Sequence, residues 1–211
     1  MEPARNAEYK SRAYWDARFE AEAEHEWLGS FAQLRGPIMD ALAPLLGTPA
    51  QVLVLGCGNS ALSAELAAAQ PEWTVVSVDF SAAVIARMRA RHPELEWTED
   101  DMTALRSLAE GRFDAVVDKA GMDALVTDEG DPWRPSASAV RDVDATVAAV
   151  GRVLKRAGGR FVQVSFQQPH FRRKHLERAM AADTARQWAP VRVAEVDVGL
   201  GYFVFSSQVC A

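Results

Sequence analysis

Cysteine is scarce in this chain of 211 residues, which has only Cys57 and Cys210. Their wide separation suits neither a disulfide framework nor a cysteine metal site. We therefore expect free thiols in a reducing compartment, and we predict a cytoplasmic protein. The amino-terminal residues also lack the apolar core of a secretory signal.

Long apolar runs and an excess of basic residues are lacking as well. No stretch approaches the roughly 18 apolar residues of a membrane span, so no membrane insertion is predicted. The formal net charge of −6 disfavours general nucleic-acid binding, which needs a basic face against phosphate. Hydrophobic residues make up 49% of the chain, enough for a proper core in one large domain or a domain with an extension.

What the chain does have is a nucleoside-binding pattern. An apolar strand runs into the turn Gly56-Cys-Gly58, and the next apolar strand ends in Asp79. Gly56 and Gly58 carry no Cβ, so the backbone can turn tightly and approach a ligand closely. Asp79 stands about 20 residues after Gly56, the distance expected of a ribose-binding carboxylate. The alternative, that Asp79 caps the following helix, is weaker because Ser81 is better placed for a cap.

Strands and helices alternate from residue 51 onward, which predicts an α/β fold. Apolar strands without polar alternation fit a parallel sheet that is covered on both faces. We expect a doubly wound seven-strand sheet, with a terminal hairpin that contributes one antiparallel strand. Residues 1–50 are predicted to form a helical cap, and 51–211 the ligand-binding domain, in one compact unit. The strands are expected near 52–56, 74–79, 95–98, 113–118 and 160–166, with the hairpin at 191–198 and 202–209, joined by Gly199-Leu200-Gly201.

The helical cap has its own local signals. Ser30 and Gln33 resemble a capping box at the start of a helix, and Gly36-Pro37 is expected to kink or split that helix. Trp15 and Phe19 stand four residues apart and share one helical face.

The glycine turn alone does not identify the nucleoside, because residues 56–61 also fit a dinucleotide fingerprint. Two features point away from a nicotinamide: the roughly fifty residues before the first strand, and the terminal hairpin, which is foreign to a six-strand parallel sheet. A third is the run Glu99-Asp100-Asp101-Met102, whose acids suit an adenine amino group and a sulfonium. We therefore predict S-adenosylmethionine as cofactor. The alternative for Asp100 and Asp101 is an exposed acidic turn.

Several longer motifs occur together between about Tyr9 and about Arg178. They are Tyr14-Trp-Asp-Ala-Arg-Phe19, Glu26-Trp-Leu-Gly-Ser-Phe31, Leu53-Val-Leu-Gly-Cys-Gly-Asn-Ser-Ala-Leu-Ser63, Asp101-Met102, Phe113-Asp-Ala-Val-Val-Asp-Lys119, Met122-Asp-Ala-Leu125, Gly130-Asp-Pro-Trp133 and Gln168-Pro-His-Phe171. Together they resemble the seven-strand S-adenosylmethionine-dependent methyltransferases that modify lysines of eukaryotic translation elongation factor 1A.

The resemblance implies a Rossmann-like class I methyltransferase fold without a metal, and S-adenosylhomocysteine as a product. It implies that a cofactor site is made by Trp15, Phe19 and Trp27 as a cover, Gly56 and Gly58 at the turn, Asp79 at the ribose, Asp101 and Met102 beside the adenine, and Lys119 near the methionine end. From the residues alone, the three aromatic side chains are equally compatible with plain core. The chain departs from the family at Phe19, where tyrosine is common, and at Ala120-Gly121-Met122, which replaces Gly-Thr-Leu.

A lysine acceptor must lose a proton before it attacks, since its pKa is ordinarily near ~10.4. A carboxylate beside the channel can orient the ammonium while desolvation lowers that pKa. Asp118 is the first candidate for this catalytic role and Asp123 the second. Helix capping, or an ion pair with Lys119, is an equally good interpretation of Asp118.

The predicted activity is methylation of an elongation factor 1A-like protein by a monomeric enzyme. A methyltransferase for a small molecule or RNA stays open, suggested by the altered 120–122 segment and by the basic run Arg172-Arg-Lys-His175. That run is more typical of a solvated helix face. A non-catalytic, cofactor-binding partner protein is the third possibility. Trp133, in a long loop over 127–138, is predicted either to cover the substrate or to pack the loop down.

Overall fold

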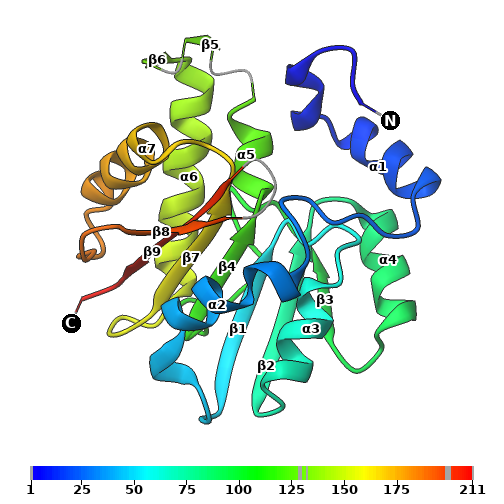
Figure 1. Ribbon diagram of the computed structural model, residues 1–211, viewed down its shortest axis with the longest axis horizontal. Coiled ribbons are helices and arrows are strands. Elements are labelled where there is room, and N and C mark those ends of the chain that lie inside the picture. Colours follow the sequence, from blue (N-terminus) through cyan, green and yellow to red (C-terminus); the bar gives the residue numbers. More distant parts are fainter. Residues whose placement is uncertain (1, 128–129, 132, 198–200, 211) are drawn as a thin grey trace.

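A seven-stranded sheet forms the centre of the computed structural model, which describes residues 2–127, 130–131, 133–197 and 201–210 (Figure 1). Its strand order is β3-β2-β1-β4-β7-β9-β8. The strands are β1 (Ala50–Leu55), β2 (Trp73–Asp79), β3 (Glu96–Glu99), β4 (Ala115–Lys119), β7 (Arg160–Ser165), β8 (Arg192–Val196) and β9 (Tyr202–Gln208). The first five run parallel, and β9 runs antiparallel to both β7 and β8. The predicted doubly wound α/β sheet with an antiparallel carboxy-terminal strand is confirmed.

Helices cover both faces of the sheet. They are η1 (Asn6–Lys10), α1 (Arg12–Ala21), α2 (Phe31–Ala41), η2 (Ala43–Leu45), α3 (Leu62–Ala69), α4 (Ala82–Arg91), α5 (Gly121–Leu125), α6 (Ala137–Val153) and α7 (Pro169–Ala182), and a small hairpin pairs β5 (Gly130–Asp131) with β6 (Arg134–Pro135). Val52 belongs to the core cluster on the side of α2 to α4, and its neighbour Leu53 to the cluster on the side of α6 and α7. Successive strand residues point to opposite faces, so a sheet covered twice needs unbroken apolar strands.

Helix α2 contains both the predicted capping box and the predicted point of interruption. The backbone N–H of Ser30 donates to Gln33 Oε1 over 2.9 Å, as a capping box requires. The helix does not split at Pro37 but continues to Ala41. Leu34 and Ile38 are fully buried on its inner face. This burial holds the helix in place although the proline removes one hydrogen bond.

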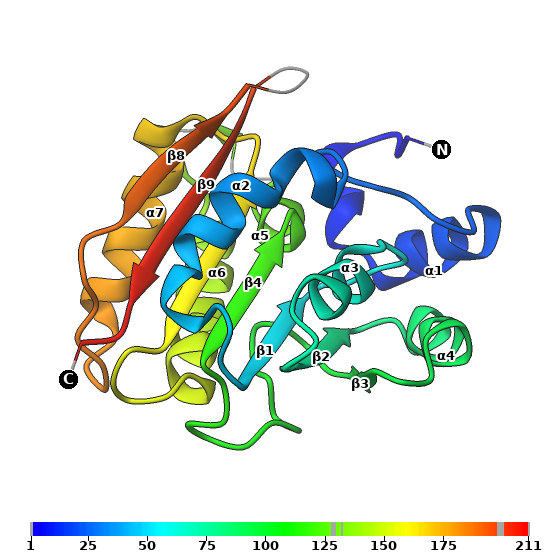
Figure 2. The same ribbon diagram turned by 60° about the horizontal axis from the view of Figure 1, so that its bottom comes forward.

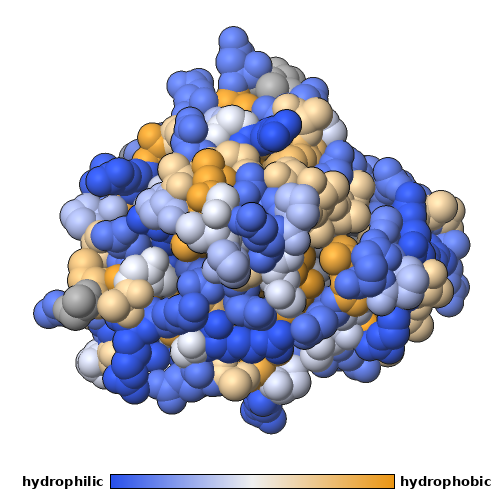
Figure 3. All heavy atoms as spheres, turned by 90° about the horizontal axis from the view of Figure 1, so that it is seen from below, coloured by the Kyte–Doolittle hydropathy of each residue, from blue (hydrophilic) through white to orange (hydrophobic). Residues whose placement is uncertain are grey.

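The parallel strands deliver their carboxyl ends to a single edge of the sheet. The amino-terminal segment with η1 and α1 lies beyond that edge, and η1 packs against α5 while α1 packs against α4 (Figure 2). The opposite end of the molecule is mostly hydrophilic, with small scattered apolar groups (Figure 3). Strands β8 and β9 pair as the predicted hairpin, and of the residues predicted to join them, Gly199 and Leu200 lie outside the described residues. Of the helices that the structure describes, none is both long and apolar enough to span a bilayer.

Candidate active site

A cavity of about 820 Å³ lies at the carboxyl ends of the central strands, beneath the amino-terminal segment. Its size is within the range of roughly 300–1,000 Å³ typical of small-molecule sites. Ten of the residues singled out from the sequence line it together: Trp15, Phe19, Trp27, Gly56, Gly58, Asp79, Asp101, Met102, Lys119 and Asp123. Asp118 is not among the described residues that line this cavity.

The glycine turn after β1 forms part of the cavity wall. Gly56 and Gly58 have φ angles of +51° and +50°, which glycine adopts without strain. A Cβ on Gly58 would lie 3.4 Å from two ring carbons of Phe19, so the aromatic ring packs directly on the turn. The turn and the aromatic cover are therefore fitted to each other.

Asp79 is fixed beneath the turn. Its carboxylate accepts hydrogen bonds from the N–H groups of Gly58 and Ser81, each over 2.9 Å. Only 5% of the residue is exposed, and this burial raises the pKa of Asp79 to about 6. Ser81, and not Asp79, is the N-cap of α4, because its Oγ accepts from the N–H of Val84. The alternative of a simple helix cap for Asp79 is thus removed.

The acidic run after β3 lies beside Asp79, because the N–H of Asp100 donates to the carbonyl of Asp79 over 3.0 Å. Asp101 is exposed, and its carboxylate accepts from the N–H and hydroxyl of Thr103 over 2.8 and 2.7 Å. Met102 is half-buried, and its sulfur lies 3.4 Å from the position that a Cβ of Gly121 would occupy. Asp101 therefore belongs to an exposed acidic turn that also forms part of the cavity wall.

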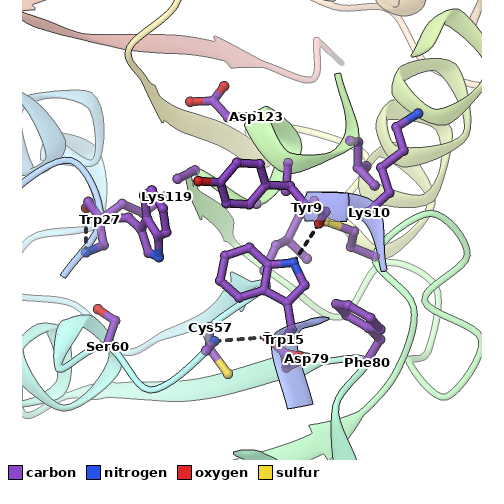
Figure 4. A pocket seen from close by; sticks show the side chains of 18 of the residues that line it. Tyr9, Lys10, Trp15, Trp27, Cys57, Ser60, Asp79, Phe80, Lys119 and Asp123 are labelled. Carbon is purple, nitrogen blue, oxygen red and sulfur yellow. Dashed lines mark hydrogen bonds between the residues drawn. The ribbon is translucent and has the colours of Figure 1, made fainter. Parts of the chain in front are cut away.

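Aromatic rings of the amino-terminal segment cover the cavity (Figure 4). The rings of Trp15 and Phe19 stack with centroids 5.6 Å apart, and Trp27 meets Trp15 edge-on at 5.9 Å. The indole N–H of Trp15 donates to the carbonyl of Tyr9 over 2.6 Å. Phe19 belongs to the core cluster and also lines the cavity. The sequence interpretation did not single out Tyr9.

Lys119 ends β4 at the cavity wall with its side chain only 4% exposed. Its ammonium donates to the carboxylate of Glu26 and to the carbonyls of Trp27 and Gly29. Burial lowers the pKa of Lys119, and the carboxylate of Glu26 opposes that shift. Its ion-pair partner is thus Glu26 rather than Asp118, and the sequence interpretation gave Glu26 no role.

Asp118 lies behind the cavity wall, fully buried. Its carboxylate accepts from Gln163 Nε2 over 2.8 Å and from the N–H of Met122 over 3.2 Å, at the start of α5. Burial raises the pKa of Asp118 to about 6. These contacts correspond to the helix-end interpretation of this residue.

Asp123, on α5, is one of the residues that line the cavity, and in Figure 4 it lies on the far side of Tyr9 from Cys57 of the glycine turn. Its carboxylate accepts from Ser165 Oγ over 2.7 Å and forms an ion pair with Arg172. Burial raises the pKa of Asp123, and the guanidinium of Arg172 acts against this rise. Asp123 is thus a buried carboxylate whose ion-pair partner is Arg172.

The basic run at 172–175 is not a solvated face. Arg172 is fully buried and His175 is buried, while Arg173 and Lys174 are exposed. The expectation was wrong because an α-helix turns successive residues to different sides, and α7 directs Arg172 at Asp123. Trp133 is 67% exposed, and its ring contacts Phe171 edge-on at 5.0 Å.

The donor set of the cavity fits an adenosyl cofactor. A buried carboxylate lies at the end of β2, an exposed one follows β3, and aromatic rings and a glycine turn lie between them. These are the groups that ribose hydroxyls, an adenine amino group and an apolar thioether chain require. Among the described residues, no group of three or more His, Cys, Asp or Glu side chains is placed to hold a metal ion.

Comparisons with known proteins identify a methyltransferase domain and its fold. A family model described as a methyltransferase domain matches residues 52–132. The fold is similar to that of geranyl diphosphate C-methyltransferase from Streptomyces coelicolor A3(2), with a TM-score of 0.61 and 15% identity over 98% of this chain and 99% of that chain. A Burkholderia thailandensis 1,6-didemethyltoxoflavin-N1-methyltransferase gives 0.56 and 20% over 100% and 93%. Both were solved with S-adenosylhomocysteine.

Fold likeness alone does not define the reaction, because the [4+2]-cyclase SpnF is similar too, with a TM-score of 0.62 at 12% identity over 99% of this chain and 98% of that chain. The fold, the matched domain and the cavity together define an S-adenosylmethionine-dependent methyltransferase.

Relatives in sequence show which family of methyltransferases the chain belongs to. The chain is 42% identical to "EEF1A lysine methyltransferase 4" of Bos taurus, over 84% of this chain and 69% of that protein. The Mus musculus protein of that name is 40% identical, over 82% and 68%. The "eEF1A lysine and N-terminal methyltransferase" of Homo sapiens is 33% identical over 92% of this chain and 26% of its own length. This chain belongs to the family of the eEF1A lysine methyltransferases, as the resemblance in its motifs predicted.

Proposed function

We propose that this protein transfers a methyl group from S-adenosylmethionine to a lysine of an elongation factor 1A-like protein. One observation carries the proposal: the cavity with the cofactor constellation around Asp79 also has a second buried carboxylate, Asp123, on its wall. The identity to EEF1A lysine methyltransferase 4 supports the choice of a lysine acceptor. A monomeric, cytoplasmic enzyme remains our expectation.

The residues that would hold the cofactor are those named from the sequence. Asp79 would accept hydrogen bonds from the ribose hydroxyls, Asp101 and Met102 would flank the adenine, and the turn at Gly56 and Gly58 would take the amino-acid end. When bound, S-adenosylmethionine supplies an electrophilic methyl on a cationic sulfur. Trp15, Phe19 and Trp27 would exclude water above it, as the cover of a reacting site does.

Asp123 is the carboxylate that we assign to the acceptor amine. It lines the cavity, whereas Asp118 is not among the described residues that do so. A carboxylate in this place would hold the incoming lysine ammonium and orient its nitrogen. Desolvation in the cavity would lower the pKa of that lysine, and water could then carry its proton away.

Incubation of purified elongation factor 1A with the enzyme and isotopically labelled S-adenosylmethionine tests this proposal directly. We expect label on lysine after digestion of the product. The variant Asp123→Asn should lose about a hundredfold in turnover, the size of a misplaced reacting group, with unchanged affinity for S-adenosylhomocysteine. Asp40→Asn, an equal charge change at an exposed site on α2, is the control. Label on serine or arginine and none on lysine would refute the proposal.

A transfer assay in cell extract distinguishes a protein acceptor from RNA or a small molecule. Transfer to an extract should disappear after protease treatment and survive nuclease treatment and dialysis. Loss after nuclease or dialysis would instead identify RNA or a small molecule as the acceptor.

A further inference from the structure

Tyr9 is placed over the acceptor side of the cavity by several contacts. It belongs to η1, which packs against α5, the helix that carries Asp123. The neighbouring Lys10 forms an ion pair with Asp142 of α6 over 3.0 Å. The carbonyl of Tyr9 accepts from the indole of Trp15, and its hydroxyl donates to Glu2. Its ring is therefore held from both ends and lines the cavity.

The ring of Tyr9 extends an aromatic surface toward Asp123. Its centroid lies 5.8 Å from that of Trp27, edge-on, and 5.9 Å from that of Trp15. In Figure 4 the phenol ring lies between the indole of Trp15 and the carboxylate of Asp123, and Trp27 lies to one side with Lys119. Burial raises the pKa of Tyr9 above its usual value, so the ring stays a neutral phenol.

Aromatic faces and a carboxylate around one space are the features that recognise an organic cation. Ring faces attract ammonium groups when the cation is within about 6 Å of the centroid, and most strongly when water is excluded. The guanidinium of Arg18 already lies over the ring of Trp27, 4.9 Å from its centroid. The cation–π contacts among the described residues do not include the ring of Tyr9. The ammonium of Lys119 is engaged by Glu26 and two carbonyls. The ring of Tyr9 therefore lines a cavity in which a ligand cation would fit.

We propose that Tyr9 forms the aromatic wall of the acceptor site opposite Asp123, and that Tyr9 determines specificity for an alkylammonium acceptor. This inference rests on the proposed function, since the acceptor it describes is a lysine side chain. Tyr9 acts by contact with the charged end of that side chain before its proton is lost. A neutral acceptor of the same length makes no cation–π contact with this ring, so the ring adds nothing to its affinity.

The test measures binding of n-butylammonium, the end of a lysine side chain, to the protein saturated with S-adenosylhomocysteine. Butan-1-ol is the neutral probe, and NMR titration gives both dissociation constants. We expect the wild type to prefer the ammonium, and Tyr9→Leu to weaken ammonium binding by roughly tenfold, the size of a desolvated cation–π contact. Tyr9→Phe keeps the ring and should bind as the wild type does. Tyr14→Leu is the matched control, because Tyr14 touches Tyr9 at 5.4 Å but does not line the cavity.

Three results would overturn the assignment. Equal binding of the ammonium and the alcohol by the wild type would exclude a cation site. A Tyr9→Leu variant that binds n-butylammonium as the wild type does would exclude the role of this residue. An equal loss of S-adenosylhomocysteine affinity would assign Tyr9 to the cofactor instead. The probes do not include elongation factor 1A, so selective ammonium binding without labelling of that protein would refute the proposed substrate and still support the role of Tyr9.

Discussion

The carboxylate of Glu26 and the ammonium of Lys119 form an ion pair that joins the amino-terminal segment to the end of β4 at the cavity wall. Lys119 has three N–H donors, and Glu26 with two backbone carbonyls satisfies all of them. Glu26 also accepts from Ser60 Oγ and from the N–H of Ala61 before α3, over 2.8 and 2.6 Å. We infer that Lys119 acts on the cofactor by holding the aromatic cover closed.

Lys119→Met should therefore open the cover. Glu26 keeps two other donors, so the loss of unfolding free energy should be about 2 kcal/mol, below the roughly 3–5 kcal/mol of a fully orphaned buried charge. The dissociation constant for S-adenosylhomocysteine should rise, and proteolysis of the amino-terminal segment should speed up. Lys174→Met, at an exposed position on α7, is the control. Unchanged cofactor affinity and unchanged proteolysis would contradict this role of Lys119.

Asp79→Ala tests the ribose assignment. Removing a charged hydrogen-bond acceptor should weaken cofactor binding by about 1–3 kcal/mol. Calorimetry with S-adenosylhomocysteine measures this loss. Glu72→Ala, an exposed change at the other end of β2, should bind as the wild type does. An Asp79→Ala variant with wild-type affinity would refute the assignment.

Asp118 makes stability depend on pH. Its folded-state pKa of about 6 is above the unfolded value of roughly 3.9, so the folded protein binds more protons between these values. Its contribution to stability is therefore complete below about pH 4 and is lost as the pH rises through 6, by on the order of 2–3 kcal/mol. Asp79 acts in the same direction in wild type and variant alike.

Asp118→Asn removes the ionisation of Asp118. A reoriented amide of Gln163 can accept from the new side-chain N–H, because Gln163 Oε1 has no partner among the described residues. We expect the variant to be more stable than the wild type at pH 7, with the difference shrinking toward pH 4.5. Urea unfolding at pH 4.5, 5.5 and 7 measures it. A difference that grows as the pH falls would show that Asp118 is stabilised as a carboxylate.

Arg172→Met tests the cation behind Asp123. Arg172 Nε and Nη1 have no partner among the described residues, so the pair with Asp123 is the ionic contact of this guanidinium. Removing it leaves a buried carboxylate unpaired, which should cost about 3–5 kcal/mol of unfolding free energy. The pKa of Asp123 should rise, and the acid limb of the activity–pH profile should move to higher pH. Arg173→Met, exposed on the same helix, should leave that limb in place, and an unmoved limb in folded Arg172→Met would contradict the assignment.

The sequence predicted those parts of the site that depend on local pattern. Gly56 and Asp79 follow directly from a strand–turn–helix–strand unit, and parallel strands bring their carboxyl ends to one edge. The motifs added Trp15 and Trp27 by resemblance, and the need to orient a lysine acceptor added Asp123 as the second candidate for that role. All of these residues line one cavity.

The contacts that the sequence did not predict join segments far apart in the chain. Glu26 and Lys119 are separated by 93 residues, and Asp123 and Arg172 by 49. No periodicity or cap signal relates such pairs, because tertiary packing alone brings them together. The same limit explains the error at 172–175, where composition indicated a solvated face but helix geometry directs one arginine inward.

A crystal structure with S-adenosylhomocysteine tests the central claim most directly. The account predicts the ribose hydroxyls on the carboxylate of Asp79, the purine beside Met102, and the sulfur facing the space between Tyr9 and Asp123. A cavity left empty at saturating ligand, or a ligand bound with its purine at Lys119 and Trp27, would contradict it.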